Sequence, residues 1–196
     1  MKRTLIIIGA VLLLVILFYS TFKNSYNTMV TKTQQVESQW AGVETQYQRR
    51  MDLYSSVVST IKGSAEFEQE TLTKVIEARS KATSVQVDPT KLTPESLEQF
   101  QKAQGEMSSA FSRLMVVVEQ YPQLQSTASF KEFQTQIEGT ENRINKARND
   151  FNNSVQDYNT YIKQFPTNLM AGMFGFTDKG YFKSDAGSEK APKIEF

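Results

Sequence analysis

Two pairs of charged residues could carry chemistry in this sequence: Arg49 with Arg50, and Glu138 with Glu141. Arg50 breaks a nearly apolar, coiled-coil-like seam that recurs every three to four residues between positions 26 and 61. Glu138 and Glu141 are three positions apart, so they would share one face of a helix. An arginine inside an apolar seam needs carboxylate partners, because its desolvation otherwise goes uncompensated. The pattern therefore predicts a polar layer of these four side chains.

This polar layer has a functional and a structural interpretation. As a functional site it would bind a ligand or, through its carboxylates, a metal ion, although the arginines beside it repel cations. As a structural feature it would fix the register of the helices, as polar residues do at core positions of coiled coils. We favour the structural interpretation, and we expect no catalytic, cofactor-binding or metal-binding residue in the chain.

The composition removes the commonest catalytic chemistry. The 196 residues include no histidine and no cysteine, which excludes Ser-His and Cys-His catalysis, thiolate metal sites and disulfides. The net charge is +1, so no global electrostatic field attracts nucleic acid or acidic ligands. We therefore expect a protein that is not an enzyme, needs no cofactor and does not bind nucleic acid.

The elements that position the polar layer begin with an N-terminal anchor. Residues 4–22 read TLIIIGAVLLLVILFYSTF and carry no charge. As a helix they would be about 28 Å long, close to the thickness of the hydrocarbon core. A cleaved signal peptide is the alternative, but no small-x-small site follows the apolar run. Lys2 and Arg3 precede the run, and the positive-inside rule places them in the cytoplasm. Residues 1–22 are thus predicted to be a single-pass anchor in the cell membrane, with the body on the outer, periplasmic side.

Residues 23–166 are predicted to form an antiparallel, up-and-down bundle of long helices, so the fold class is all-α. The first helix continues from the anchor without a turn signal to about Gly63. A second helix ends at about Ala82, before a loop that contains Pro89. The first helix leads away from the membrane, the second returns, the third leads away and the fourth returns. The chain is therefore expected near the bilayer again after the fourth helix.

The third and fourth helices carry their own start and stop signals. Thr93 suits the N-cap and Pro94 the first helical position of the third helix. Pro122 stops that helix. Ser129–Glu132 fits a capping box that opens the fourth helix, which ends at Phe165-Pro166.

An antiparallel pairing of the first and fourth helices brings the charged residues together. With Lys23 placed beside Gln164, the numbers of facing residues sum to about 187, because both helices rise equally per residue. Arg49 and Arg50 then face the neighbourhood of Glu138 and Glu141.

Residues 167–196 are predicted to form a C-terminal tail that is first apolar and then polar and extended. Its apolar part, NLMAGMFGF at 168–176, either lies in the membrane interface or caps the end of the bundle. Both alternatives remain open. The candidate interface residues are Leu169, Met170, Met173, Phe174 and Phe176.

Short motifs spread over the four predicted helices and the tail. They include Arg49–Leu53, Tyr121–Pro122, Glu138–Ile144, Phe165–Pro166 and Gly172–Phe176. On these motifs the chain resembles the LemA family along nearly its whole length. The resemblance implies an N-terminal membrane anchor and a helical bundle, but it brings no reaction, because the family has no settled activity. Many members carry a histidine near the position of Phe67, so no role of that histidine can be transferred to this chain.

Three functions follow from these features. The first, which we favour, is a membrane-anchored scaffold or adaptor of the bacterial cell envelope, without catalysis. Its partners would be the lipid bilayer and an unidentified protein or a second copy of the chain. The second is a membrane-remodelling protein that uses residues 168–176 as an interfacial element. The third is a metal-binding or ligand-binding site in the polar layer.

Overall fold

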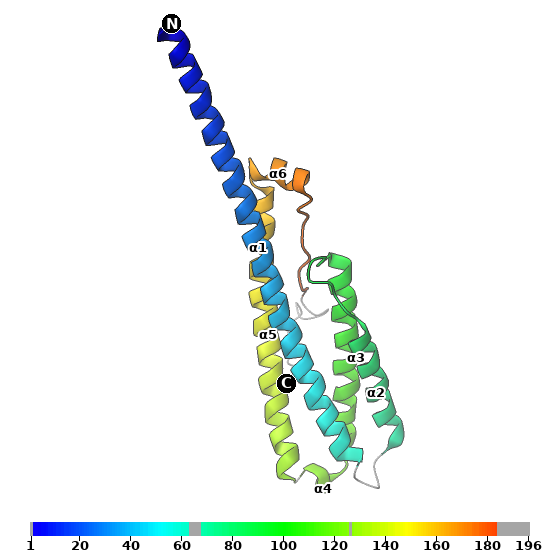
Figure 1. The fold of residues 1–196 in the computed structure, drawn as a ribbon. Coiled ribbons are helices and arrows are strands. Elements are labelled where there is room, and N and C mark those ends of the chain that lie inside the picture. Colours follow the sequence, from blue (N-terminus) through cyan, green and yellow to red (C-terminus); the bar gives the residue numbers. More distant parts are fainter. Residues whose placement is uncertain (1, 63–67, 126, 184–196) are drawn as a thin grey trace, which may run out of the picture.

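The computed structural model describes residues 2–62, 68–125 and 127–183. Within them the chain forms helices and no strand, so the predicted all-α class is confirmed (Figure 1). The helices are α1 (Lys2–Lys62), α2 (Gln69–Ser84), α3 (Pro94–Val118), α4 (Pro122–Gln125), α5 (Ala128–Lys163) and α6 (Thr167–Phe174).

Helix α1 is one unbroken element of 61 residues. At 1.5 Å per residue it is about 90 Å long. Its N-terminal third projects beyond the other helices (Figure 1), and every large apolar side chain from Leu5 to Tyr19 is at least 51% exposed. It is also the one helix among the described residues that is long and apolar enough to cross a membrane. The anchor and the first bundle helix are therefore continuous, as predicted; the predicted end at Gly63 lies outside the described residues.

The remaining helices arrange around the rest of α1. Helix α5 runs antiparallel along α1, and α2 packs against α3 (Figure 1). The short α4 joins α3 to α5 at the end far from the anchor. The C-terminal end of α5 therefore lies at the anchor end of the bundle, followed by α6, as the alternating helix directions predicted.

Buried side chains form two apolar clusters along the bundle. The cluster nearer the anchor centres on Trp40, whose ring lies 5.2 Å from Phe100 of α3 and 5.6 Å from Phe151 of α5. The distal cluster includes Tyr54 and Phe111, whose rings stack at 3.7 Å between centroids. The predicted three-four seams thus supply the core of both clusters.

The caps of α3 and α5 differ in how well the sequence predicts them. Thr93 accepts a hydrogen bond from the Ser96 amide at 3.2 Å, and Pro94 occupies the first turn, as predicted. The predicted capping box at Ser129–Glu132 is wrong, because α5 begins at Ala128. Its N-cap is Thr127, whose hydroxyl accepts a hydrogen bond from the Phe130 amide at 3.3 Å. Starting two residues earlier places Phe130 in the distal cluster.

The segment after α6 returns along the bundle between α3 and α5, and we call residues 176–183 the strap (Figure 1). Asn159 accepts from the Lys179 amide and donates to the Lys179 carbonyl, both at 2.9 Å. Asn152 does the same for Phe182, at 2.9 and 3.0 Å. Phe182 enters the Trp40 cluster. The predicted tail thus packs on the bundle as far as residue 183; residues 184–196 lie outside the described residues.

Candidate functional site

The polar layer is built around Arg50, which is 4% exposed although it carries a charge. Its Nη2 donates to Oε1 of Gln104 on α3 at 2.7 Å and to the Gln104 carbonyl at 3.3 Å. Its Nη1 lies 3.4 Å from Oε1 of Glu141 on α5. Three helices therefore meet at this one guanidinium. Its contact with the Glu141 carboxylate agrees with the rule that buried charges are paired.

Two tyrosines complete the layer. The guanidinium carbon of Arg50 lies 4.7 Å from the ring centre of Tyr47 and 5.8 Å from that of Tyr54. The Tyr54 hydroxyl donates to Oε1 of Glu141 at 3.4 Å, and Arg148 Nε donates to the Tyr47 hydroxyl at 2.8 Å. Burial raises the pKa of Tyr54 to about 12 and raises the pKa of Tyr47 as well. Both phenols therefore stay protonated at neutral pH.

Of the four predicted layer residues, the structure brings together Arg50 and Glu141. Arg49 lies on the exposed outer face of α1 with Gln48 and Asp52, since one residue along a helix turns the side chain by about 100°. Glu138 is also exposed. Gln104 was not predicted to belong to the layer. It is the one polar residue among the buried and otherwise apolar positions of α3, and that contrast was the available signal.

The pairing register of α1 and α5 differs from the expected one. Arg50 pairs with Glu141 and Tyr47 with Arg148, so facing residue numbers sum to 191 and 195 rather than about 187. The shift is one to two helical turns. At the anchor end, Phe174 of α6 packs against Phe22 at 5.6 Å between ring centres, where the end of α5 was expected.

The position of the layer indicates what it does. It lies between the two apolar clusters, with Tyr47 in one and Tyr54 in the other. Arg50 Nε is buried and has no hydrogen-bond partner. No group of three or more acidic side chains within residues 2–62, 68–125 and 127–183 is placed to hold a metal ion. The observed contacts join three helices at one level, which is what a register-fixing layer requires.

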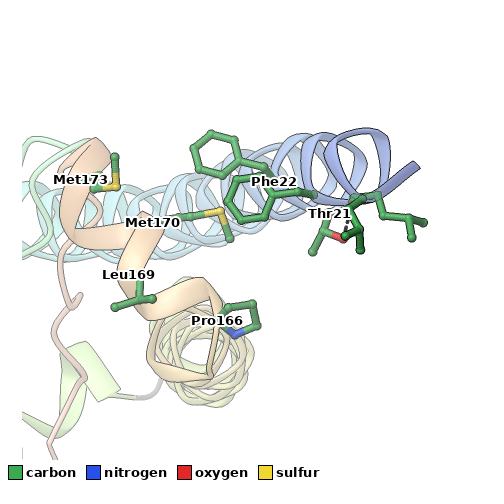
Figure 2. A pocket seen from close by; sticks show the side chains of 9 residues that line it. Thr21, Phe22, Pro166, Leu169, Met170 and Met173 are labelled. Atoms are coloured by element: carbon green, nitrogen blue, oxygen red, sulfur yellow. Dashed lines mark hydrogen bonds between the residues drawn. The ribbon is translucent and has the colours of Figure 1, made fainter. Parts of the chain in front are cut away.

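A second candidate site lies where the anchor leaves the bundle. An apolar hollow of about 480 Å³ opens between α1 and α6 (Figure 2). Met170 is buried and Phe176 half-buried against the core, while Leu169, Met173 and Phe174 are exposed by 61%, 75% and 46%. Of the five predicted interface residues, Met170 and Phe176 thus cap the bundle and Leu169 and Met173 face outward. Phe174 packs against Phe22 and Tyr26 and stays partly exposed.

Comparison with known proteins assigns this chain to a family. The sequence model described as LemA family matches residues 39–196, which is most of the chain. The chain belongs to the LemA family. Together with the apolar N-terminal helix, this membership makes it a membrane-anchored helical protein.

The chain is also similar to proteins that are named for the magnetosome. Magnetosome protein MamQ 2 of Paramagnetospirillum magneticum is 30% identical over 190 residues, covering 86% of this chain and 68% of that protein. Magnetosome protein MamQ of Magnetospirillum gryphiswaldense is 26% identical over 184 residues, covering 84% and 67%. Protein LemA of Metamycoplasma hominis is 26% identical over 156 residues, covering 79% and 67%. None of these names states a reaction.

Proposed function

We propose that this protein is a membrane-anchored scaffold or adaptor of the bacterial cell envelope that acts without catalysis. The observation that carries the proposal is the continuity of α1, which runs from Lys2 through the apolar span and along the bundle to Lys62 at its far end. A bundle joined to its anchor by a helix, with no flexible linker, cannot swivel freely. Its faces therefore keep a fixed orientation relative to the bilayer.

The surface of the bundle supports a reversible protein partner. Between residues 27 and 163, the large apolar side chains that are exposed among the described residues are Val30, Ile76 and Val116, which lie singly on three different helices. Permanent interfaces are more apolar than this, whereas reversible ones resemble the ordinary protein surface. The partner we propose is an unidentified membrane or envelope protein, or a second copy of the chain, and not a nucleic acid.

Photocrosslinking in intact membranes tests the adaptor role. A photoreactive residue replaces Gln48 on the outer face of α1 or Val116 on α3, both exposed. The control is the same residue at Leu13, within the span. We expect a protein adduct from at least one bundle position and none from Leu13. Monomer alone from every bundle position would contradict the adaptor role.

We also propose that the N-terminus is cytoplasmic and the bundle periplasmic, because Lys2 and Arg3 precede the span. The chain has no cysteine, so Val116→Cys introduces a single thiol into the bundle. A membrane-impermeant maleimide added to cells with a permeabilised outer membrane should label it. If labelling required disruption of the inner membrane, the bundle would be cytoplasmic and the proposed orientation would be wrong.

Membrane remodelling is a second candidate function, supported by α6. This short helix lies at the anchor end and exposes Leu169 and Met173, and an apolar element inserted into one leaflet can respond to or induce curvature. Full-length protein added to large vesicles should then tubulate or fragment them. Intact vesicles at high protein density would eliminate this candidate and leave the scaffold role in place.

A further inference from the structure

The apolar hollow at the anchor end has two walls, which meet at an angle (Figure 2). One wall is the outer part of α1 and the other is α6 with the proline before it. The α1 wall consists of Leu14, Leu17, Phe18, Thr21 and Phe22. The opposite wall consists of Pro166, Leu169, Met170 and Met173. We call this hollow the anchor corner.

The chemistry of the anchor corner suits a hydrocarbon chain. No charged side chain lines it. Its one hydroxyl, on Thr21, already donates to the Leu17 carbonyl at 2.9 Å, so no polar group is left to select a polar ligand. Apolar pockets that bind polar ligands contain convergent polar groups, and this pocket has none among its described lining residues.

The depth of the anchor corner in the membrane identifies which hydrocarbon reaches it. Its α1 wall belongs to the membrane span, where lipid is the surrounding medium. From Leu14 to Phe22 that wall rises about 12 Å, close to the roughly 15 Å depth of one leaflet. The chains of lipids in the leaflet next to the bundle therefore lie at the right level, whereas a soluble partner would have to enter the bilayer.

Exposed apolar side chains and a basic residue surround the anchor corner. Phe165 is 81% exposed immediately before α6, and Met173 points out of the helix at its far end. Lys23 is exposed directly after the span, where a basic side chain can reach lipid phosphates. Lys163, which ends α5 at the same end of the bundle, is paired with Asp178 at 2.6 Å.

We propose that the anchor corner binds the acyl chain of a membrane lipid and that α6 lies in the interface as a second membrane contact. The protein then touches the bilayer at two places, so the tilt of the bundle is fixed as well as its attachment. This inference depends neither on a protein partner nor on vesicle deformation. Loss of either proposed function would leave it intact.

The first experiment measures how deep two labelled positions, one on α6 and one on α3, lie in the bilayer. Full-length Met173→Cys and Val116→Cys proteins carry a nitroxide and are reconstituted into vesicles of phosphatidylcholine and phosphatidylglycerol. Collision with oxygen and with a water-soluble nickel chelate reports the depth of each label. We expect the label at position 173 to favour oxygen and the label at 116 to favour nickel. Equal exposure of both labels to nickel would overturn the proposal, and dipolar broadening at 173 would mean that a second copy covers the anchor corner.

The second experiment fills the anchor corner. Leu17→Trp adds an indole to its wall, and Leu13→Trp, a residue of the same span outside the lining, is the matched control. Phosphatidylcholine with a nitroxide on its acyl chain reports the motionally restricted lipid at the protein. We expect Leu17→Trp to remove a restricted component that wild type and Leu13→Trp retain. An unchanged component in Leu17→Trp would overturn lipid binding in the anchor corner.

Discussion

Arg50 of α1 and Gln104 of α3 are joined by a 2.7 Å hydrogen bond in the interior of the bundle, fifty-four positions apart in sequence. The bond links the helix that carries the apolar N-terminal span to α3, which lies away from the projecting N-terminal third of α1 (Figure 1). Because both side chains are buried, neither can move to water without breaking the layer. Through these contacts the polar layer joins α3 to the anchor helix.

Replacing Arg50 tests whether the layer is structural. Arg50→Met should lower the free energy of unfolding by about 1–3 kcal/mol, because buried Gln104 loses its charged donor. Arg49→Met, one residue away on the exposed face, should change it by less than about 0.5 kcal/mol. Urea unfolding of the full-length proteins in detergent micelles measures both.

The double variant Arg50→Met with Gln104→Leu should recover part of the lost stability, since matched apolar side chains can replace a buried polar pair. Equal effects of Arg50→Met and Arg49→Met would contradict a structural layer. If Arg50→Met, or its combination with Glu141→Gln, kept full stability but failed to replace the wild-type protein in cells, the layer would instead be a ligand site.

The strap depends on two asparagines that donate and accept at once. In Asn152→Asp the carboxylate still accepts from the Phe182 amide but cannot donate to its carbonyl, so the strap should open more often. We expect faster amide exchange throughout residues 176–183, measured by mass spectrometry. The exposed neighbour Asn153 gives the control Asn153→Asp, and equal exchange in both variants would contradict the role of Asn152.

A close backbone approach requires glycine at position 180. A Cβ there would lie 2.8 Å from the Cα and N atoms of Pro94, and backbone atoms cannot rotate away. Gly180→Ala should therefore cost about 1–3 kcal/mol of unfolding free energy. Gly42→Ala, inside α1 with nothing within 4 Å of the added carbon, should instead gain about 0.5–1 kcal/mol. Urea unfolding that ranks the two variants the other way would refute the packing of the strap on Pro94.

The raised pKa of Tyr54 predicts a loss of stability in alkali. Because the folded-state pKa of about 12 exceeds the ordinary value of 10.0, the stabilising contribution is complete below pH 10 and is lost as the pH rises toward 12. The expected loss is roughly 1–2 kcal/mol. The measurement compares unfolding midpoints of wild type and Tyr54→Phe between pH 9 and 12.

Tyr54→Phe should remove the part of the alkaline slope that Tyr54 contributes, while Tyr47 and Tyr158, whose pKa values are also raised by burial, contribute equally in both proteins. Burial lowers the pKa of Lys179, which acts in the opposite direction, but Lys179 is present in both proteins and its effect cancels in the comparison. Parallel curves for wild type and Tyr54→Phe would show that the Tyr54 phenol does not titrate differently on folding.

Features set by nearby residues were predictable from the sequence. The span, the Thr93 cap and the three-four seams each depend on residues within a few turns of one another. Arg50 was recognisable because a charged residue in an apolar seam must find partners, and the antiparallel pairing of α1 with α5 limited those partners to one stretch.

Features that join distant segments were not predictable. Phe182 packs on Trp40, with ring centres 6.0 Å apart, yet the strap has no periodicity that separates it from an exposed tail. Gln104 was visible as a polar residue in its seam, but no rule of spacing sets the height of α3 against α1. The register of α5 against α1 and the packing of α6 on Phe22 are likewise contacts between distant segments, and no local pattern signals them.

The continuity of α1 is the central claim, and a distance measurement across the membrane boundary tests it most directly. Nitroxides on Leu13→Cys in the span and Ala41→Cys in the bundle are 28 residues apart, which is about 42 Å in an unbroken helix. Double electron–electron resonance on the full-length protein in lipid vesicles should give one narrow distribution near that distance. A broad distribution, or one centred well below it, would mean that the anchor bends away from the bundle and would contradict a scaffold of fixed orientation.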